Sequence, residues 1–347
     1  HHSITDCAMI VRMEYDFIAI GDTVTDEFIE LDDVRIDTDP DPEDKGYEEI
    51  CFRFGDKVTY KNISTVHAVG NSANAAVSAT RLGLSTALVT NIGGDELGKK
   101  ILETLISNGI STSFVQVHKD MPSNYHFVLQ FGAERTILIK HQPYPYTLPN
   151  IGNPKWIYLS SLSESSIPYH HEIAKYLETH PSVKLAFQPG TLQIQLGVKE
   201  LADLYKRTHI FFCNREEAGR ILETSEIDDV KKLAQDISSL GPKVVVVTDG
   251  PKGSLAYDSL NNEIFSVTMY PDPKPPVDRT GAGDAFSSTV VAALALEKPL
   301  SEALLWGPIN SMSVVQHIGA QKGLLKRDMI EKYLSEAPAG YEVKKLS

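Results

Sequence analysis

Short apolar segments alternate with helical segments between residues 156 and 222, and this alternation constrains the fold more than any other feature of the chain. Each apolar segment has the length of a buried strand, and the stretches between them are long enough for helices. The pattern predicts a doubly wound α/β fold, in which a mostly parallel sheet is flanked by helices. The expected strands are 156–159, 183–187 and 209–212, and the expected helices lie near 169–178, 198–205 and 216–222.

The first strand of this sheet is expected at residues 15–20, an apolar run that ends at Gly21. In open parallel sheets, ligands bind outside the carboxyl ends of the strands. Asp22 and Asp26 follow this strand and are therefore candidates to accept hydrogen bonds from substrate hydroxyl groups. The alternative for Asp22 is that it only terminates the strand.

Residues 27–66 and 113–140 interrupt the α/β pattern. Within both segments, apolar and polar residues alternate between turn residues, which indicates short antiparallel strands. We expect the two segments to pair into a small antiparallel sheet that projects as a lid from a large domain made of 15–26, 67–112 and 141–334. The alternating runs are 51–54, 57–60, 125–130 and 135–140, and an acidic, proline-containing loop is expected at 37–44.

Residues 277–286 are the strongest candidate for chemistry. Gly281 and Gly283 bracket Ala282, and a small apolar run follows at helical spacing, so we expect a glycine turn that opens a helix. Such a turn presents backbone N–H groups and the positive end of the helix dipole at one point, which suits a phosphate. Asp284 would repel that phosphate unless it had another task, such as taking a proton from an attacking hydroxyl. The alternative is that Asp284 only complements the helix dipole and the glycines only form a turn.

The sequence Val-Asp-Arg-Thr-Gly-Ala-Gly-Asp-Ala-Phe at 277–286 resembles the C-terminal signature of the ribokinase-like (PfkB-type) carbohydrate kinase family. Residues 91–98 resemble its N-terminal signature, and the resemblance covers roughly residues 15–334. It implies a kinase that uses ATP and Mg²⁺ to phosphorylate a hydroxyl group of a sugar or nucleoside under a β lid. It also implies that Asp284 is the general base and that the N–H groups of 281–283 stabilise the charge of the moving phosphoryl group.

The resemblance assigns substrate binding to residues that precede and follow the first lid segment, 27–66, in the sequence. Asp26 matches the aspartate that contacts substrate hydroxyls in the family. Gly70, Asn71 and Asn74 match its Gly-Gly-x-x-x-Asn substrate loop, although Val69 replaces the first glycine. The alternative for Asn74 is an ordinary hydrogen bond at a helix start.

The same resemblance assigns the nucleotide and its metal to the second half of the chain. Asn214 and Glu217 match the Asn-x-x-Glu motif that organises Mg²⁺, water and phosphate, although the spacing also fits a helix capping box. Thr248, Gly250 and Gly253 follow a run of four valines and match the region that contacts the nucleotide, although a plain turn would look the same.

Two further assignments concern ions and phosphate. Asp278 and Thr280 match the region where many members of the family hold a monovalent cation, so K⁺ could bind there. Arg135 lies in the second lid segment and could clamp phosphate or substrate, with a solvated surface arginine as the alternative.

Composition excludes several other classes of protein. The net charge of −13 disfavours a nucleic-acid surface or an anionic membrane as partner. Cys7, Cys51 and Cys213 are widely spaced, which indicates reduced thiols in a cytosol and neither a disulfide framework nor a zinc site. No apolar run approaches the ~20 residues of a membrane-spanning helix, so we expect a cytoplasmic protein. Residues 1–13 begin with His1-His2 and read as a tag or leader.

We therefore predict an ATP-dependent kinase that acts on a small neutral sugar, ribose-like or fructose-like. A nucleoside kinase of the adenosine type is the alternative, because Phe52 and Phe54 in the long lid insertion could stack on a purine. A phosphorylated sugar would need a Lys and Arg cluster near the lid, which the sequence does not show. A catalytically idle sugar-binding protein could have the same fold, but Asp284 and the Asn214/Glu217 pair argue against it. Lids form dimer interfaces in some members of the family, so a homodimer through the lid is a further expectation.

Overall fold

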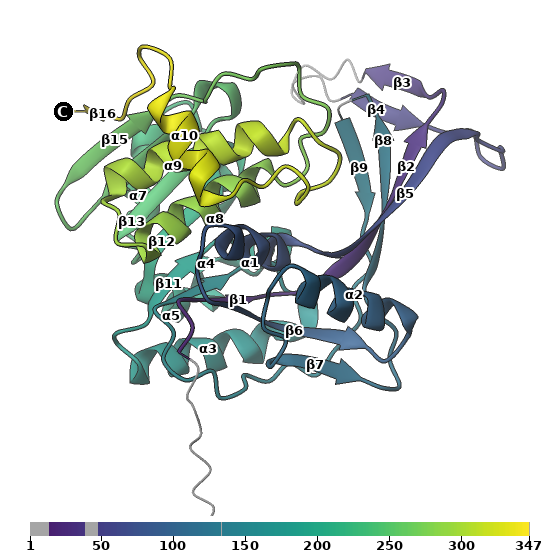
Figure 1. The fold of residues 1–347 in the computed structure, drawn as a ribbon, viewed down its shortest axis with the longest axis horizontal. Coiled ribbons are helices and arrows are strands. Elements are labelled where there is room, and N and C mark those ends of the chain that lie inside the picture. Colours follow the sequence, from purple (N-terminus) through teal and green to yellow (C-terminus); the bar gives the residue numbers. More distant parts are fainter. Residues whose placement is uncertain (1–13, 39–47, 133, 347) are drawn as a thin grey trace, which may run out of the picture.

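The computed structural model describes residues 14–38, 48–132 and 134–346, so the expected leader at 1–13 and most of the expected acidic loop lie outside the described residues. A ten-stranded sheet runs through the molecule (Figure 1). The strands from β13 to β7 are parallel, and β14, β15 and β16 add an antiparallel edge. In spatial order the strands are β16 (Lys344–Leu346), β15 (Glu263–Val267), β14 (Ser254–Asp258), β13 (Val244–Thr248), β12 (Thr208–Asn214), β11 (Lys184–Phe187), β10 (Trp156–Leu159), β1 (Phe17–Ile20), β6 (Thr86–Gly93) and β7 (Val115–His118).

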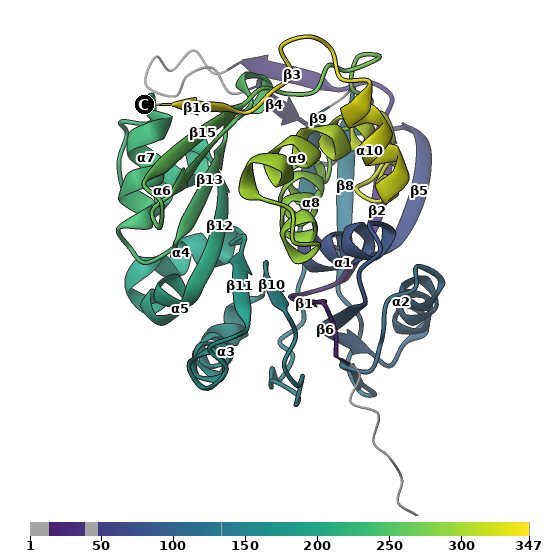
Figure 2. The ribbon, with the colours of Figure 1, turned by 60° about the vertical axis from the view of Figure 1, so that its left-hand side comes forward.

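Helices cover both faces of this sheet (Figure 2). The strands are buried from both sides, so β1 reads as a continuous apolar run in which Phe17 and Ala19 face one core and Ile18 and Ile20 face the other. This arrangement confirms the predicted doubly wound α/β fold. The first core holds α1 (Asn71–Arg81), α2 (Glu96–Ser107), α8 (Ala282–Ala295), α9 (Leu300–Val314) and α10 (Arg327–Ser335), and the second holds α3 (Ile167–Thr179), α4 (Thr191–Glu200), α5 (Ala202–Arg207), α6 (Arg215–Ile221) and α7 (Val230–Ser238).

A second sheet of four strands stands beside the large one, and we call it the lid sheet (Figure 1). Its order is β5 (Tyr60–Val69), β2 (Val24–Leu31), β8 (Tyr125–Phe131) and β9 (Glu134–Leu138). The β8–β9 pair is the hairpin predicted around Gly132, whereas the central pair β2–β8 is parallel. A separate antiparallel pair, β3 (Arg35–Thr38) and β4 (Glu48–Cys51), extends from it.

The strands divide between the two sheets differently from the expected boundaries. β7 falls within the segment 113–140 but pairs in parallel with β6, because helix α2 carries the chain back to the edge of the large sheet. β2 already starts at Val24, so Asp26 lies on the lid sheet and not in the large domain. Neither β2 nor β7 was among the predicted alternating runs, and the alternation could not show which strands pair with each other.

The alternating runs at 51–54 and 57–60 are mostly loop, which corrects the expectation of two strands there. Residues 52–59 connect β4 to β5, and only the ends of the two runs belong to strands. Gly55 has a φ of +78°, which reverses the chain, and Phe54 is fully exposed. An alternating run forms a strand only where a neighbouring backbone offers hydrogen bonds, and this loop has no such neighbour among the described residues.

The order of the strands creates a single edge at which ligands can bind. The chain passes from β1 to β6 on one side and later places β10 on the other side of β1, so the strand order reverses at β1. Such reversal points open a crevice outside the carboxyl ends of the strands. Asp22, Gln188 and Asn214 lie at the carboxyl ends of β1, β11 and β12, so this edge collects polar side chains. None of the described helices has the length and apolar composition that crossing a membrane requires.

Two isoleucines on α2 provide a matched test of the first core. Ile101 is fully buried, whereas Ile106 on the same helix is 62% exposed. We expect Ile101→Ala to lower the free energy of unfolding by about 2–5 kcal/mol, and Ile106→Ala to change it by less than about 0.5 kcal/mol. Urea denaturation followed by circular dichroism measures both values, and equal losses would contradict this packing of α2.

Candidate active site

Asp284 lies in the first turn of α8, directly after the predicted glycine turn. Gly281 has a φ of +78°, and a Cβ atom there would lie 2.2 Å from the Cβ atom of Ala320, so only glycine fits this position. Helix α8 begins at Ala282, and the first N–H groups of a helix have no acceptor within the helix. The turn therefore presents N–H groups and the positive helix end beside the carboxylate of Asp284.

Three amide side chains hold the Asp284 carboxylate. Asn71 and Asn74, at the start of α1, donate from Nδ2 to Oδ1 and Oδ2 of Asp284, each over 2.8 Å. Gln188, which follows β11, donates from Nε2 to Oδ1 over 3.1 Å. The two asparagines that the sequence assigned to substrate thus contact the proposed base directly, and Gln188 was not predicted.

Burial and hydrogen bonding act on Asp284 in opposite directions. Burial raises the pKa of this carboxyl group, whereas the hydrogen bonds from Asn74, Asn71 and Gln188 and the charge of Arg135 lower it. The net effect is a pKa above the usual range for aspartate. A carboxylate with a raised pKa is a stronger proton acceptor, which suits a general base.

Two cavities meet at the start of α8. The lid cavity, of about 370 Å³, lies between the lid sheet and the large sheet and contains Asp284. The β13 cavity, of about 440 Å³, lies beyond the end of β13. Arg279, Ala282 and Gly283 line both cavities, so the turn before Asp284 forms the boundary between them.

The lid cavity contains polar atoms that lack partners within the described part of the protein. Oδ1 of Asp26, Nε2 of His126 and Nε of Arg135 are buried without a hydrogen-bond partner. Nδ1 of His126 lies 3.4 Å from Oδ1 of Asp26, so the two groups form an ion pair when the ring is protonated. Buried polar atoms without partners are costly, which points to a ligand that pairs with them. Asp26 and Arg135, which the sequence assigned to substrate, both line this cavity.

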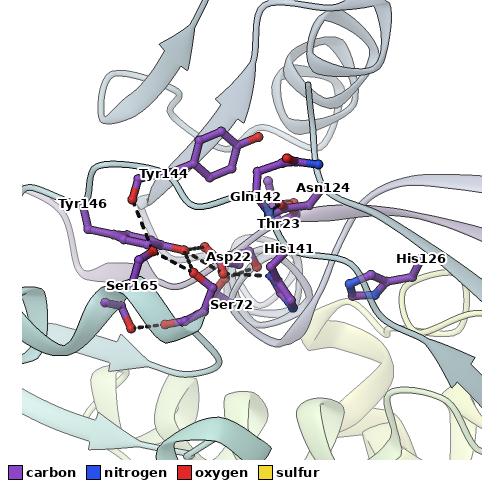
Figure 3. A network of polar contacts seen from close by, with 12 residues as sticks. Asp22, Thr23, Ser72, Asn124, His126, His141, Gln142, Tyr144, Tyr146 and Ser165 are labelled. Carbon is purple, nitrogen blue, oxygen red and sulfur yellow. Dashed lines mark hydrogen bonds and ion pairs between the residues drawn. The ribbon is translucent and has the colours of Figure 1, made fainter. Parts of the chain in front are cut away.

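Asp22 also lines the lid cavity, but neighbouring groups already hold its carboxylate (Figure 3). The Tyr146 hydroxyl lies 2.7 and 2.9 Å from its two oxygens, and Nδ1 of His141 lies 3.1 Å from Oδ2. Burial, followed by the charge of Asp22, raises the pKa of Tyr146, so the phenol keeps its proton and donates. Asp22 therefore has less free hydrogen-bonding capacity for a substrate than Asp26.

Asn214 and Glu217 form a reciprocal capping box at the start of α6. Oδ1 of Asn214 accepts from the Glu217 N–H over 2.7 Å, and Oε2 of Glu217 accepts from the Asn214 N–H over 2.8 Å. Glu217 also lines the lid cavity and a small cavity of about 110 Å³ that it shares with Gly283. Burial raises the pKa of Glu217. Asn214 and Glu217 therefore cap α6, and Glu217 also faces the cavities beside Asp284.

The three residues assigned to the nucleotide lie together at the β13 cavity. Thr248, Gly250 and Gly253 line it from the end of β13 and the short helix that follows (Gly250–Lys252). A Cβ atom on Gly253 would lie 2.2 Å from the backbone oxygen of Val267, which explains the glycine there. The apolar part of the wall was not predicted and comprises Met269, Tyr270, Pro271, Pro276, Phe286 and Val315.

Asp278 and Thr280 shape the loop before α8. Oδ1 of Asp278 accepts from the N–H and the hydroxyl of Thr280 over 2.9 and 2.6 Å, and Oδ2 accepts from the Gly319 N–H over 2.8 Å. A carboxylate has about four acceptor positions, so three of them are taken. Across the described residues, no three His, Cys, Asp or Glu side chains come together as a metal site.

His126, His141, Tyr146 and Gln188 are the site residues that sequence reasoning missed. Gln188 had a detectable signal, because it directly follows a predicted strand, 183–187, at the edge where ligands bind. The two histidines had no such signal. His126 lies on β8 and His141 follows β9, and the sequence did not reveal that β8 pairs with β2, which carries Asp26.

Gly281 and Gly283 differ in the space around them, which gives a test of this turn. We expect Gly281→Ala to lower the melting temperature by several degrees, because its Cβ atom would clash with Ala320 at a positive φ. Gly283→Ala should keep or raise the melting temperature, because the nearest atom to its Cβ, Nε2 of Gln188, is 3.9 Å away and alanine favours a helix. Thermal unfolding of both variants measures this, and equal stability would contradict the turn geometry.

Comparisons with known proteins agree with this arrangement. Residues 42–327 match the family described as pfkB family carbohydrate kinase. A ribokinase of Bacillus subtilis is 27% identical over 290 residues, covering 81% of this chain and 92% of that protein. A nucleoside kinase of Methanothermobacter thermautotrophicus is 27% identical over 320 residues, covering 89% of this chain and 92% of that protein.

A solved structure supports the fold. The Arabidopsis thaliana ribokinase complexed with ribose and ATP superposes with a TM-score of 0.76 at 21% identity, covering 93% of this chain and 99% of that one. The family match over most of the sequence confirms the resemblance drawn from residues 91–98 and 277–286. The chain belongs to the pfkB family of carbohydrate kinases and has the ribokinase fold.

Proposed function

We propose that the protein transfers the γ-phosphoryl group of ATP to a hydroxyl group of a small neutral sugar, ribose-like or fructose-like. One observation carries this proposal: Asp284 and the N–H groups at the start of α8 lie where the lid cavity meets the β13 cavity. An acceptor in the lid cavity and a nucleotide in the β13 cavity would meet at this boundary. Proximity of this kind removes much of the entropic barrier to transfer.

Asp284 would take the proton of the acceptor hydroxyl as that oxygen attacks the γ-phosphorus. The N–H groups of residues 281–283 and the positive end of α8 would stabilise the charge on the phosphoryl oxygens. Arg135 reaches the same cavity from β9 with its Nε atom unpartnered among the described residues, and its charge acts on Asp284. We assign to it the neutralisation of the phosphoryl group from the lid side.

Magnesium and a monovalent cation would act on the nucleotide side. Glu217 offers one carboxylate between two cavities and would hold Mg²⁺ there, largely through water, and this ion would supply positive charge against the phosphates of ATP. Asp278 retains about one free acceptor position. A K⁺ ion there would therefore be bound mainly by backbone carbonyl groups of the two loops that carry Thr280 and Gly319.

The charges of the lid cavity favour a neutral acceptor. Asp22 and Asp26 lie beside His141 and His126, so these four groups offset one another when the rings are protonated. Arg135 is then left for the transferred phosphoryl group, whereas Arg279, the other arginine that lines this cavity, lies 3.8 Å from Glu134. Asp26, with a buried oxygen that accepts no hydrogen bond from the described residues, is the best candidate to accept from a sugar hydroxyl.

The outer face of the lid sheet supports the proposal of a homodimer. Ile63, Phe127 and Leu138 are each more than 40% exposed and lie on three different strands of this sheet. Phe127 is paired with Leu138 in the register, so these apolar side chains lie side by side. A second copy of the lid sheet would cover them.

Replacement of Asp284 tests the proposed mechanism. We expect Asp284→Asn to lower kcat by about 10²–10⁴-fold, because asparagine cannot accept the proton. ADP release coupled to NADH oxidation measures this across D-ribose, D-fructose and adenosine. Retained turnover would contradict the mechanism. Sugars that raise the melting temperature without stimulating ADP release would instead identify an idle sugar-binding protein.

A nucleoside acceptor is the second candidate, and a third cavity favours it. This cavity, of about 770 Å³, shares Ile139, His141, Ser161 and Thr191 with the lid cavity. Its aliphatic wall contains Leu162 and Leu192, and Gln142 and Gln195 add amide groups that could pair with a base edge. Phe54, which the sequence offered as a stacking residue, lines none of these three cavities.

Narrowing this third cavity separates the two acceptor classes. We expect Leu192→Trp to raise the KM for adenosine at least about ten-fold if a base occupies the cavity, and to leave the KM for D-ribose unchanged. Steady-state kinetics with both acceptors decides between them. Activity with D-ribose alone in the unmodified protein would exclude the nucleoside reading.

A further inference from the structure

We propose that Gln188 is a positioning residue, which fixes the Asp284 carboxylate and maintains its ionised form as the base of the reaction. The inference rests on the proposed function of Asp284 but concerns a residue to which neither the sequence motifs nor the family match assigns a role. Gln188 directly follows β11 and donates to Oδ1 of Asp284, the oxygen that also accepts from Asn71 of α1. It also lines both the lid cavity and the small cavity beside Glu217.

The orientation of the Gln188 amide is determined by two hydroxyl groups. The Tyr158 hydroxyl donates to Oε1 of Gln188, and Oγ of Ser287 lies 3.0 Å from the same atom. Tyr158 and Ser287 also contact each other over 2.7 Å. With Oε1 held by these hydroxyls, the amide must direct Nε2 towards Asp284, and a flipped amide would place two oxygens against each other.

Asn74 is oriented in an equivalent way on the other side of the carboxylate. Nε2 of Gln321 donates to Oδ1 of Asn74 over 3.0 Å, so the Nδ2 group of Asn74 faces Asp284. The carboxylate is thus held from α1 and from β11 by amides that cannot rotate without losing another hydrogen bond. Gln188 is the only one of the three amides on the β11 side.

The charged and titratable groups around Asp284 predict the consequence of losing Gln188. Arg135 from β9 lowers the pKa of Asp284, and Asp284 in turn raises the pKa of Glu217 on α6 and of Tyr158 on β10. None of these groups replaces a hydrogen bond to Oδ1. A hydrogen bond to the charged form favours that form, so removal of the Gln188 amide should raise the pKa of Asp284.

The sign of the effect on activity follows directly. A base must be deprotonated to act, so activity falls as the pH drops through the pKa of Asp284. When that pKa rises, the acidic limb of the plot of kcat/KM against pH moves to higher pH. We expect Gln188→Met to lower kcat/KM for ATP-dependent phosphorylation of D-ribose about ten-fold near pH 6, and by less at pH 8.5.

Gln193→Met provides a matched control. Gln193 is a buried glutamine on α4 that donates to the backbone oxygen of Ser160 and has no contact with Asp284. We expect this variant to lose stability without moving the acidic limb. Tyr158→Phe removes only one hydroxyl group and should move the limb in the same direction as Gln188→Met, but less. In the double variant that combines Gln188→Met with Tyr158→Phe, the acidic limb should lie at the same pH as in Gln188→Met alone.

A measurement without acceptor separates this inference from the proposed function. Carbon-13 NMR of protein labelled at the aspartate carboxyls follows the titration of Asp284, whose resonance is identified by its loss in Asp284→Asn. An upward move of that titration in Gln188→Met, but not in Gln193→Met, supports the role of Gln188. An unchanged titration overturns it even if Asp284→Asn abolishes turnover, and an active Asp284→Asn variant overturns the proposed function itself.

Discussion

The arrangement of the site depends on how one buried carboxylate is kept charged. Asp284 is 8% exposed, and burial alone would favour its neutral form. Three amide N–H donors and one arginine oppose this effect of burial, and the pKa of the carboxyl group still lies above its usual range. The donors come from α1 and from the end of β11, which lie far apart in the sequence. The relative position of these elements is therefore a condition for the chemistry as much as for stability.

The strand order satisfies that condition. Because the strands from β1 to β13 are parallel, the segments after β1, β11, β12 and β13 all emerge along one edge of the large sheet, and the reversal at β1 opens a crevice there. The start of α8 packs against this edge through α1, with Ser78 and Thr289 in contact between the two helices. Acceptor, base and nucleotide groups can then meet although no two of them are neighbours in sequence. The glycine turn then determines only the direction in which the N–H groups at the start of α8 point.

The sequence predicted the features that depend on local patterns of residues. It did not predict the features that depend on which distant strands pair with each other. Helix α3 spans Ile167–Thr179, close to the predicted 169–178, because its apolar residues recur at helical spacing. The turn at Gly281 was equally local. β7, in contrast, reads like a lid strand but pairs with β6, and the amides of Asn71 and Asn74 point at Asp284, more than 200 residues away. Gln188 and the histidines belong to the site only because strands that the sequence could not pair bring them there.

A belt of hydrogen bonds connects the lid sheet to the large sheet near the ends of the lid strands. Asn124 donates from Nδ2 to the backbone oxygen of Thr23 and accepts from the Gln142 N–H, while Asp22 binds Tyr146 (Figure 3). These contacts join the segments through which the chain enters and leaves the lid. Asp26 and Arg135 lie beyond this belt on two strands of the lid sheet, whereas Asp284 lies on α8. The groups that we propose for substrate contact and for phosphoryl neutralisation therefore share one sheet, and the base that we propose is held by a different part of the fold.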